Sequence, residues 1–315
     1  MKRNGAMKSR SQIGRIFAGA LLLAAAILPL QSFAQVRPAA TILVHGLDTG
    51  WPARTEGNLA VGAFANYFST DCHTYWADWK QALPVSTGTP VATVALYSNT
   101  INCTGYLSKM TRADFGQANE FAHFGDSIYG FKYMDNEVNI EHLGYRLAWW
   151  IYRNYSASGK TVNIVGHSMG GLVARYAVGM TARRHADFPP FLYVNTLATV
   201  SSPHNGSPIS LCGPPLRFQC QQMLPNSAFL NVLNNQADFG NSGIPNRLFI
   251  NASGDPAASE RTNLVGTSVK YGKPYNFPYT NGIDTHGALI RDTSTVSNFA
   301  FNWFVTTRNS AGQLS

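Results

Sequence analysis

Residues 166–171, Gly-His-Ser-Met-Gly-Gly, have the residue types and spacing of a nucleophilic serine. They follow the β-branched segment 161–165 and precede a helical stretch, and a G-x-S-x-G motif between strand and helix forms a sharp, strained turn. Glycines are needed there because a Cβ atom would collide with the turn. The following helix directs free N–H groups and its positive end at the serine, where negative charge develops in acyl transfer. The motif predicts acyl transfer through Ser168; the alternative is a tight glycine turn with a buried serine.

A serine hydroxyl needs a base to take its proton, and the base needs a carboxylate to orient it. Beside an elbow of this kind, the acid and the histidine follow the serine in the chain. Of the downstream histidines, His185 ends the helix after the motif, and His204 directly follows a strand and is a candidate for lining the site. His286 precedes the final helical stretch and is the predicted base, with a structural histidine as the alternative.

The predicted acid is Asp255, which directly follows the apolar segment 247–253. Its carboxylate would select the tautomer of His286 and stabilise the imidazolium. A turn or capping role is the alternative for this residue. Three other carboxylates compete for the same task, namely Glu260, Asp284 and Asp292.

Two backbone N–H groups are expected to stabilise the oxyanion of the tetrahedral intermediate. One belongs to Met169, directly after the serine, and the other to Leu47, in the loop after the first apolar strand. His45, in the same loop, either lines the site or braces the loop by packing. His167 is a further candidate for lining the site because it precedes the serine.

Apolar periodicity predicts the elements that position these residues. Strands are expected at 41–46, 92–97, 161–165, 191–200 and 247–253, and helices at 53–70, 136–155, 170–184 and 293–306. The alternation indicates an α/β domain with a mostly parallel central sheet and helices on both faces. Long loops at about 98–135 and 205–245 interrupt it and are typical of a lid or cap.

Clusters of aromatic residues offer either an acyl groove or lid, or the core of an extra subdomain. One cluster lies near residue 75 and the other lies in the first long loop: Tyr75, Trp76, Trp79; Phe121, Phe124, Tyr129, Phe131, Tyr133. In the 136–155 helix, one of Trp149 and Trp150 is expected to be buried and the other exposed.

The amino-terminal 34 residues have the charge order of a signal peptide. Five basic residues and no acid accompany an apolar run at 16–30, which is short for a membrane span. We expect cleavage after Ala34 and a secreted or periplasmic location, with no transmembrane segment afterwards; an uncleaved anchor is the alternative. The other 281 residues, 35–315, are expected to form a single catalytic domain.

Charge and composition exclude two classes of protein. The whole chain has 24 basic and 16 acidic residues, but without residues 1–34 the balance is 19 to 16, or +3, so a nucleic-acid partner is not expected. Hydrophobic residues make up 45% and charged residues 13%, which excludes a disordered chain.

Four cysteines remain in the expected mature chain, and an even number in an exported protein favours disulfides. Three pairings are possible; the economical one joins Cys72 to Cys103 and Cys212 to Cys220. No metal site is expected, because no Cys or His ligand spacing occurs. No nucleotide or flavin motif is present, so no cofactor is expected.

Several segments together resemble the secreted bacterial lipases and esterases of the α/β-hydrolase fold, over most of residues 40–306. The similar segments are the His45-Gly46 pair, the 166–171 motif, the Ser-Pro-His-Asn-Gly-Ser segment at 202–207, the segment 220–234 and the loop of His286. Such lipases often carry the acid just before a Val-Val-Pro-like turn, where this chain has the neutral Asn263.

The resemblance implies that Ser168 is the nucleophile, His286 the base and Asp255 the acid, with Leu47 and Met169 as oxyanion donors. It also implies a lipid or ester small molecule as substrate, such as an acylglycerol met at a lipid–water interface. The same triad acting on a polyester, a phospholipid or an acyl-transfer acceptor is the second hypothesis. A catalytically inactive binding protein of this fold is the third. Oligomeric state is left open.

Overall fold

A parallel six-stranded sheet forms the centre of the structure, a computed structural model that describes residues 38–47, 71–77, 79–81, 83, 89–97, 100–115, 138–207, 218–234 and 246–250. The strand order is β3-β2-β1-β4-β5-β6, and every neighbouring pair is parallel. The strands are β1 (Ala40–Val44), β2 (Val91–Ala95), β3 (Gly105–Tyr106), β4 (Val162–His167), β5 (Val194–Val200) and β6 (Asn246–Ile250).

The two central strands are buried along their whole length. All five residues of β1 and all six of β4 are buried, as expected for strands covered on both faces of a parallel sheet. Their register pairs Ile42 with Ile164 and Val44 with Gly166. Because parallel strands end at the same edge, the residues that follow β1 and β4 emerge side by side.

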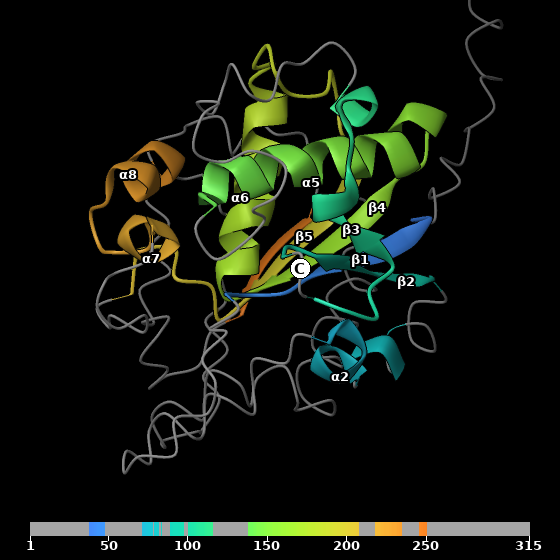
Figure 1. The fold of residues 1–315 in the computed structure, drawn as a ribbon, viewed down its shortest axis with the longest axis horizontal. Helices are drawn as coiled ribbons and strands as arrows, with labels where there is room; N and C mark the ends of the chain where they lie inside the picture. The colour runs from blue at the N-terminus through green and yellow to red at the C-terminus, as the bar shows by residue number, and fades with distance from the viewer. Residues whose placement is uncertain are drawn as a thin grey trace, which may run out of the picture. The chain divides into compact units, whose positions relative to one another are not determined.

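Two long helices cover one face of this sheet, and the short helix α2 lies on the other side (Figure 1). Helix α5 (Ile140–Asn154) begins after Asn139, whose side chain accepts a hydrogen bond from the backbone N–H of His142 and so caps the first turn. Helix α6 (Met169–Ala182) is buried at every residue from Met169 to Thr181, so it is an interior helix.

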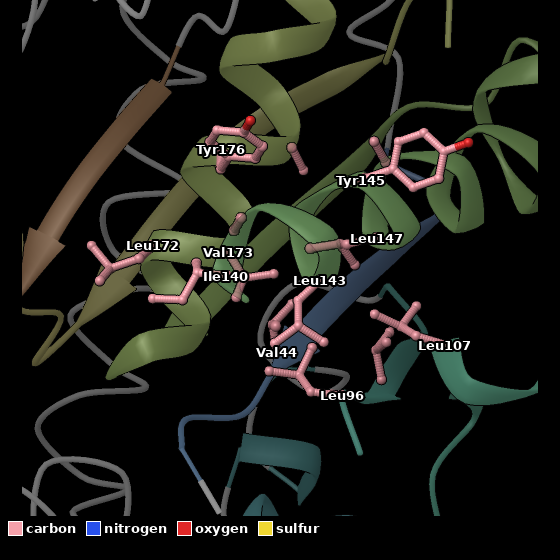
Figure 2. Packing of buried hydrophobic residues seen from close by; sticks show 14 of the residues in the cluster. Val44, Leu96, Leu107, Ile140, Leu143, Tyr145, Leu147, Leu172, Val173 and Tyr176 are labelled. Carbon is pink, nitrogen blue, oxygen red and sulfur yellow. The ribbon is translucent and has the colours of Figure 1, made fainter. Parts of the chain in front are cut away.

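Apolar side chains of α5 and α6 meet those of the sheet in one core (Figure 2). Leu143 and Leu147 of α5 lie in the same cluster as Leu172 of α6 and Val44 of β1. These four side chains are fully buried. This packing fastens α6, and the turn before it, to the centre of the sheet.

Shorter elements complete the described part of the chain. They are α2 (Cys72–Tyr75), α7 (Phe218–Gln222), α8 (Ala228–Asn234) and the 3-10 helices η1 (Leu107–Lys109), η2 (Arg112–Phe115) and η3 (Ser156–Ser158). Cys72 of α2 forms a disulfide with Cys103, with their Cα atoms 5.1 Å apart. Cys220 of α7 is also disulfide-bonded, and its predicted partner Cys212 lies outside the described residues.

The strands and helices expected from the sequence within these residues are present. Strand order and the strand β4–turn–helix α6 unit give the α/β-hydrolase fold. The expected helices at 53–70 and 293–306 and the extra aromatic residues 121–133 lie outside the described residues, as does the 1–34 segment. No described helix has the length and apolar character required to cross a membrane.

The expectation for the two tryptophans of α5 was wrong, because both are buried. Trp149 donates its indole N–H to the backbone oxygen of Asp187 at 2.9 Å. The ring of Trp150 lies against Gly105, where an added Cβ atom would overlap it. Helix α5 is therefore covered by neighbouring segments on more than one side, which the apolar periodicity of the helix alone does not show.

Candidate active site

Ser168 occupies a strained turn between the end of β4 and the start of α6. Its backbone has φ 55° and ψ −130°, a combination that non-glycine residues rarely adopt. The backbone N–H of Ser168 donates to the oxygen of Val200 at 2.8 Å, and its own oxygen accepts from the N–H of Gly171 at 3.1 Å. Such strain persists only where the surrounding structure enforces it, and it is concentrated at functional sites.

Close backbone contacts around the turn explain its glycines. A Cβ atom on Gly166 would lie 2.6 Å from the Cα atom of Gly171. One on Gly170 would overlap the backbone oxygens of Val44 and His45. The turn therefore packs directly on the end of β1, and only glycine fits at positions 166 and 170.

The loop after β1 forms the other wall of the site. A Cβ atom on Gly46 would lie 2.7 Å from Cβ of Ser168 and 3.2 Å from its Oγ. Leu47, the next residue, is buried. Within the described part of the chain, neither the backbone N–H of Leu47 nor that of Met169 is engaged in a hydrogen bond.

His45 braces this loop with both of its ring nitrogens. Nε2 accepts the backbone N–H of Leu96 at 3.0 Å, and Nδ1 lies 2.9 Å from the backbone oxygen of Gly46. With Nε2 as acceptor, Nδ1 carries the hydrogen and donates to Gly46. His45 is 5% exposed and its ring packs against Tyr75 and Tyr97, so it links the loop after β1 to the segment that follows β2.

His167 points to the opposite side of the sheet from α6, toward helix α2. Its Nδ1 lies 2.5 Å from the hydroxyl of Tyr75, which also accepts the backbone N–H of Gly46 at 3.1 Å. The rings of Tyr75 and His167 pack edge to face at 5.7 Å. Tyr75 was expected in an aromatic cluster that forms either an acyl groove or lid, or a core, and the structure places its hydroxyl between the two segments that flank Ser168.

His204 is buried beside α6 and cannot take up a proton easily. Burial and the neighbouring Arg175 guanidinium hold the pKa of His204 well below its usual value. Nδ1 of His204 accepts from Nη1 of Arg175 at 2.9 Å, so Nε2 carries the hydrogen and donates to Oγ1 of Thr199 at 2.8 Å. The ring therefore fastens the segment after β5 to α6.

Arg175 is the centre of this buried network and was not among the site residues expected from the sequence. Its Nη1 also donates to Oδ1 of Asn234 at 3.1 Å, and Asn234 Nδ2 donates to the backbone oxygen of His204 at 2.7 Å. Burial lowers the pKa of Arg175 to about 9. A lone arginine inside an otherwise apolar helix was the available signal for such a network.

The predicted base His286, the predicted acid Asp255 and its competitors Glu260, Asp284 and Asp292 lie outside the described residues. Their placement relative to Ser168 therefore stays a prediction from the sequence. Among the described residues, no group of three or more His, Cys, Asp or Glu side chains is arranged to hold a metal ion.

Comparison with known proteins relates this site to esterases. A family described as "Putative serine esterase (DUF676)" matches residues 129–229, which include β4, Ser168 and α6. A GPI inositol-deacylase of the yeast Kluyveromyces lactis is 28% identical over 149 residues. That match covers 46% of this chain and 13% of the yeast protein, so the chain corresponds to a small part of it.

Solved structures of lipases and esterases are similar to this chain at low sequence identity. A lipase-esterase related protein of Clostridium acetobutylicum has a TM-score of 0.44 at 12% identity and covers 85% of this chain and 96% of its own. Lipase BlEst2 of Bacillus licheniformis in its mature form has a TM-score of 0.42 at 16% identity, and the match covers 86% of this chain and 94% of the lipase. Phospholipase PlaB of Legionella pneumophila in complex with thio-NAD has a TM-score of 0.40 at 12% identity, and the match covers 71% of this chain and 44% of the phospholipase.

Proposed function

We propose that this chain is a serine hydrolase that cleaves carboxylic esters through an acyl-enzyme on Ser168. The observation that carries the proposal is the backbone of Ser168, held at φ 55° between β4 and α6 by contacts that exclude any side chain at Gly166 and Gly170. A strained serine at this position of an α/β sheet is the arrangement that presents Oγ to a substrate. The match to a family of serine esterases supports the same chemistry.

The proposed reaction has two halves. Oγ of Ser168 attacks the ester carbonyl carbon while His286 accepts its proton, and the oxyanion is stabilised by the N–H groups of Leu47 and Met169. The intermediate then expels the alcohol, which takes the proton from His286. Water repeats the sequence on the acyl-enzyme and releases the acid, while Asp255 orients the imidazole throughout.

Acylglycerols are the proposed substrate class, and deacylation of another lipid is the second candidate. The reason to consider the second candidate is the similarity of this chain to a protein named GPI inositol-deacylase. Both classes present an ester of a long acyl chain, so they share the chemistry at Ser168. Fatty-acid release from a triacylglycerol and from an inositol phospholipid, measured side by side, distinguishes them.

The first experiment is hydrolysis of p-nitrophenyl esters from acetate to palmitate by wild type, Ser168→Ala and a matched control, Ser156→Ala. Ser156 is buried, and its hydroxyl accepts the backbone N–H of Tyr193 ahead of β5, at the other edge of the sheet. We expect Ser168→Ala to lose a factor of about 10⁴ to 10⁶ in kcat and Ser156→Ala to keep wild-type turnover. The optimum chain length separates an esterase from a lipase, and equal activity of Ser168→Ala and wild type would refute the proposal.

The same assay ranks the candidate acids. Asp255→Asn is expected to lower kcat by several powers of ten, because an amide does not stabilise the imidazolium. Glu260→Gln and Asp284→Asn are expected to remain near wild type. If one of them is the damaging change, that residue and not Asp255 is the acid.

Export is the remaining part of the proposal. The basic and apolar character of residues 1–34 supports secretion with cleavage after Ala34. Mass spectrometry of protein recovered outside the cytoplasm is expected to show Gln35 at the amino terminus. Recovery of the intact amino terminus in the membrane fraction would show an anchor instead.

A further inference from the structure

The hydroxyl of Tyr75 lies between the two backbone segments that meet at Ser168. It accepts the backbone N–H of Gly46, one residue before Leu47, at 3.1 Å, and it lies 2.5 Å from Nδ1 of His167, one residue before Ser168. A phenol has one hydrogen and two acceptor positions, so with Gly46 on a lone pair it can still donate to His167. One side chain therefore joins the loop after β1 to the end of β4.

We propose that Tyr75 is a positioning residue that sets the distance between the loop after β1 and the serine turn, so that the N–H groups of Leu47 and Met169 converge on one oxyanion. This inference rests on the proposed function of Ser168. Oxyanion donors must lie within about 3 Å of the developing charge, and a misplacement of 1 Å can cost a factor of about 100 in rate. Two separate segments supply the two donors. A side chain that joins these segments therefore controls the distance from each N–H group to the oxyanion.

Packing holds the phenol in one place. Tyr75 is 4% exposed, and its ring makes edge contacts with His45 at 5.9 Å and His167 at 5.7 Å. Trp76, the next residue, is fully buried and packs on Tyr75 at 5.1 Å. Because the ring is packed and the hydroxyl is buried, the hydroxyl has little freedom to move. Its hydrogen bonds to Gly46 and His167 therefore hold those two residues in place.

Helix α2 itself is tied to the loop before β3. Cys72, three residues before Tyr75, forms a disulfide with Cys103 and donates its backbone N–H to Ile101 at 3.0 Å. Asp71 pairs with Ile101 in a parallel bridge, and its carboxylate accepts from the side chain of Asn102 at 3.0 Å. Helix α2, which carries Tyr75, is therefore held in place by the disulfide and by these hydrogen bonds.

Tyr75→Phe tests the proposal, because it removes the hydroxyl and keeps the ring. The primary assay is the rate constant for labelling of Ser168 by a fluorophosphonate, in which the serine oxygen attacks phosphorus, fluoride leaves and the serine proton passes to the base. This reaction needs the oxyanion donors and no knowledge of the natural substrate. The matched control is Tyr145→Phe, a fully buried tyrosine of α5 whose ring packs against Phe115 and Phe188.

Tyr75→Phe is expected to lower the labelling rate constant and the kcat for a p-nitrophenyl ester by 10- to 100-fold, with KM within twofold of wild type. Tyr145→Phe is expected to leave all three unchanged. Wild-type labelling by Tyr75→Phe, or an equal loss in Tyr145→Phe, would overturn the proposal. Absence of any labelling at Ser168 in wild type would instead refute the proposed function, so the two failures are distinguishable.

A second variant keeps the test open if Tyr75→Phe does not fold. Replacing Cys72 and Cys103 by serine keeps the Tyr75 hydroxyl but removes the disulfide that ties helix α2 to the loop before β3. The proposal expects labelling by this folded variant at 10 °C to be slowed by about threefold or more. Labelling at the wild-type rate, together with a Tyr75→Phe chain that does not fold, would assign Tyr75 to stability alone.

Discussion

Gly46→Ala is expected to disable Ser168 without unfolding the protein. The added Cβ atom would lie 2.7 Å from Cβ of Ser168 and 3.2 Å from both its Oγ and the backbone oxygen of His167, whereas ordinary contact begins at 3.4 Å. Relieving the closest contact requires a displacement of about 0.7 Å between the loop and the serine turn. Both contacting segments are buried, so the displacement falls on the site itself.

The size of the effect follows from that displacement. A shift approaching 1 Å at the reacting atoms costs a factor of about 100 in rate. Overpacking of a close-packed interior costs about 1–3 kcal/mol of unfolding free energy. We therefore expect Gly46→Ala to label with a fluorophosphonate about 100-fold more slowly than wild type, while remaining folded in a urea titration.

Gly159→Ala is the matched control for this substitution. Gly159 has φ 74° and open space where a Cβ atom would be placed, so alanine there meets backbone strain of about 1 kcal/mol and no collision. It follows η3, before β4 begins, and is expected to label at the wild-type rate. If Gly46→Ala labels as fast as Gly159→Ala, then the loop after β1 does not constrain Ser168 and the reasoning from close contact is wrong.

Two further predictions concern stability. Because burial and Arg175 hold the pKa of His204 in the folded chain well below its usual value of 6.5, the unfolded chain takes up this proton first, and the stability present above pH 6.5 is lost progressively as the pH falls. Urea titrations between pH 7 and 5 should show this loss in wild type and not in His204→Asn; parallel slopes would show that His204 protonates in the folded state. Removing the Cys72–Cys103 disulfide, whose cysteines are 31 residues apart in the chain, should lower the unfolding free energy by about 3.7 kcal/mol, and an unchanged urea midpoint for the double serine variant would contradict that value.

The serine turn could be predicted from sequence because its causes are local. A β-branched run, a G-x-S-x-G motif and an apolar helical run are adjacent in the chain, and each obeys short-range rules of backbone geometry. The same rules located β1, β4, β5 and α5, with small errors at the ends. Helix α5 begins at Ile140, four residues later than expected, because Asn139 caps it.

The role of Tyr75 could not be predicted, because its contacts join distant parts of the chain. It lies 29 residues from Gly46 and 92 residues from His167, and no local pattern relates them. The burial of both Trp149 and Trp150 has the same origin, since periodicity along a helix shows one apolar face and not the segments that cover the others.

The residues alone determined which serine is held in a strained turn, because the motif lies within one strand–turn–helix unit and the contact between Gly166 and Gly171 joins near neighbours in the chain. Only the tertiary structure decided which groups surround that turn. The close approach of Gly46 to Ser168 and the buried Arg175–His204 pair arise from strand order and helix packing. Such contacts depend on how separate elements fill one core, and that packing is a property of the whole chain rather than of any segment.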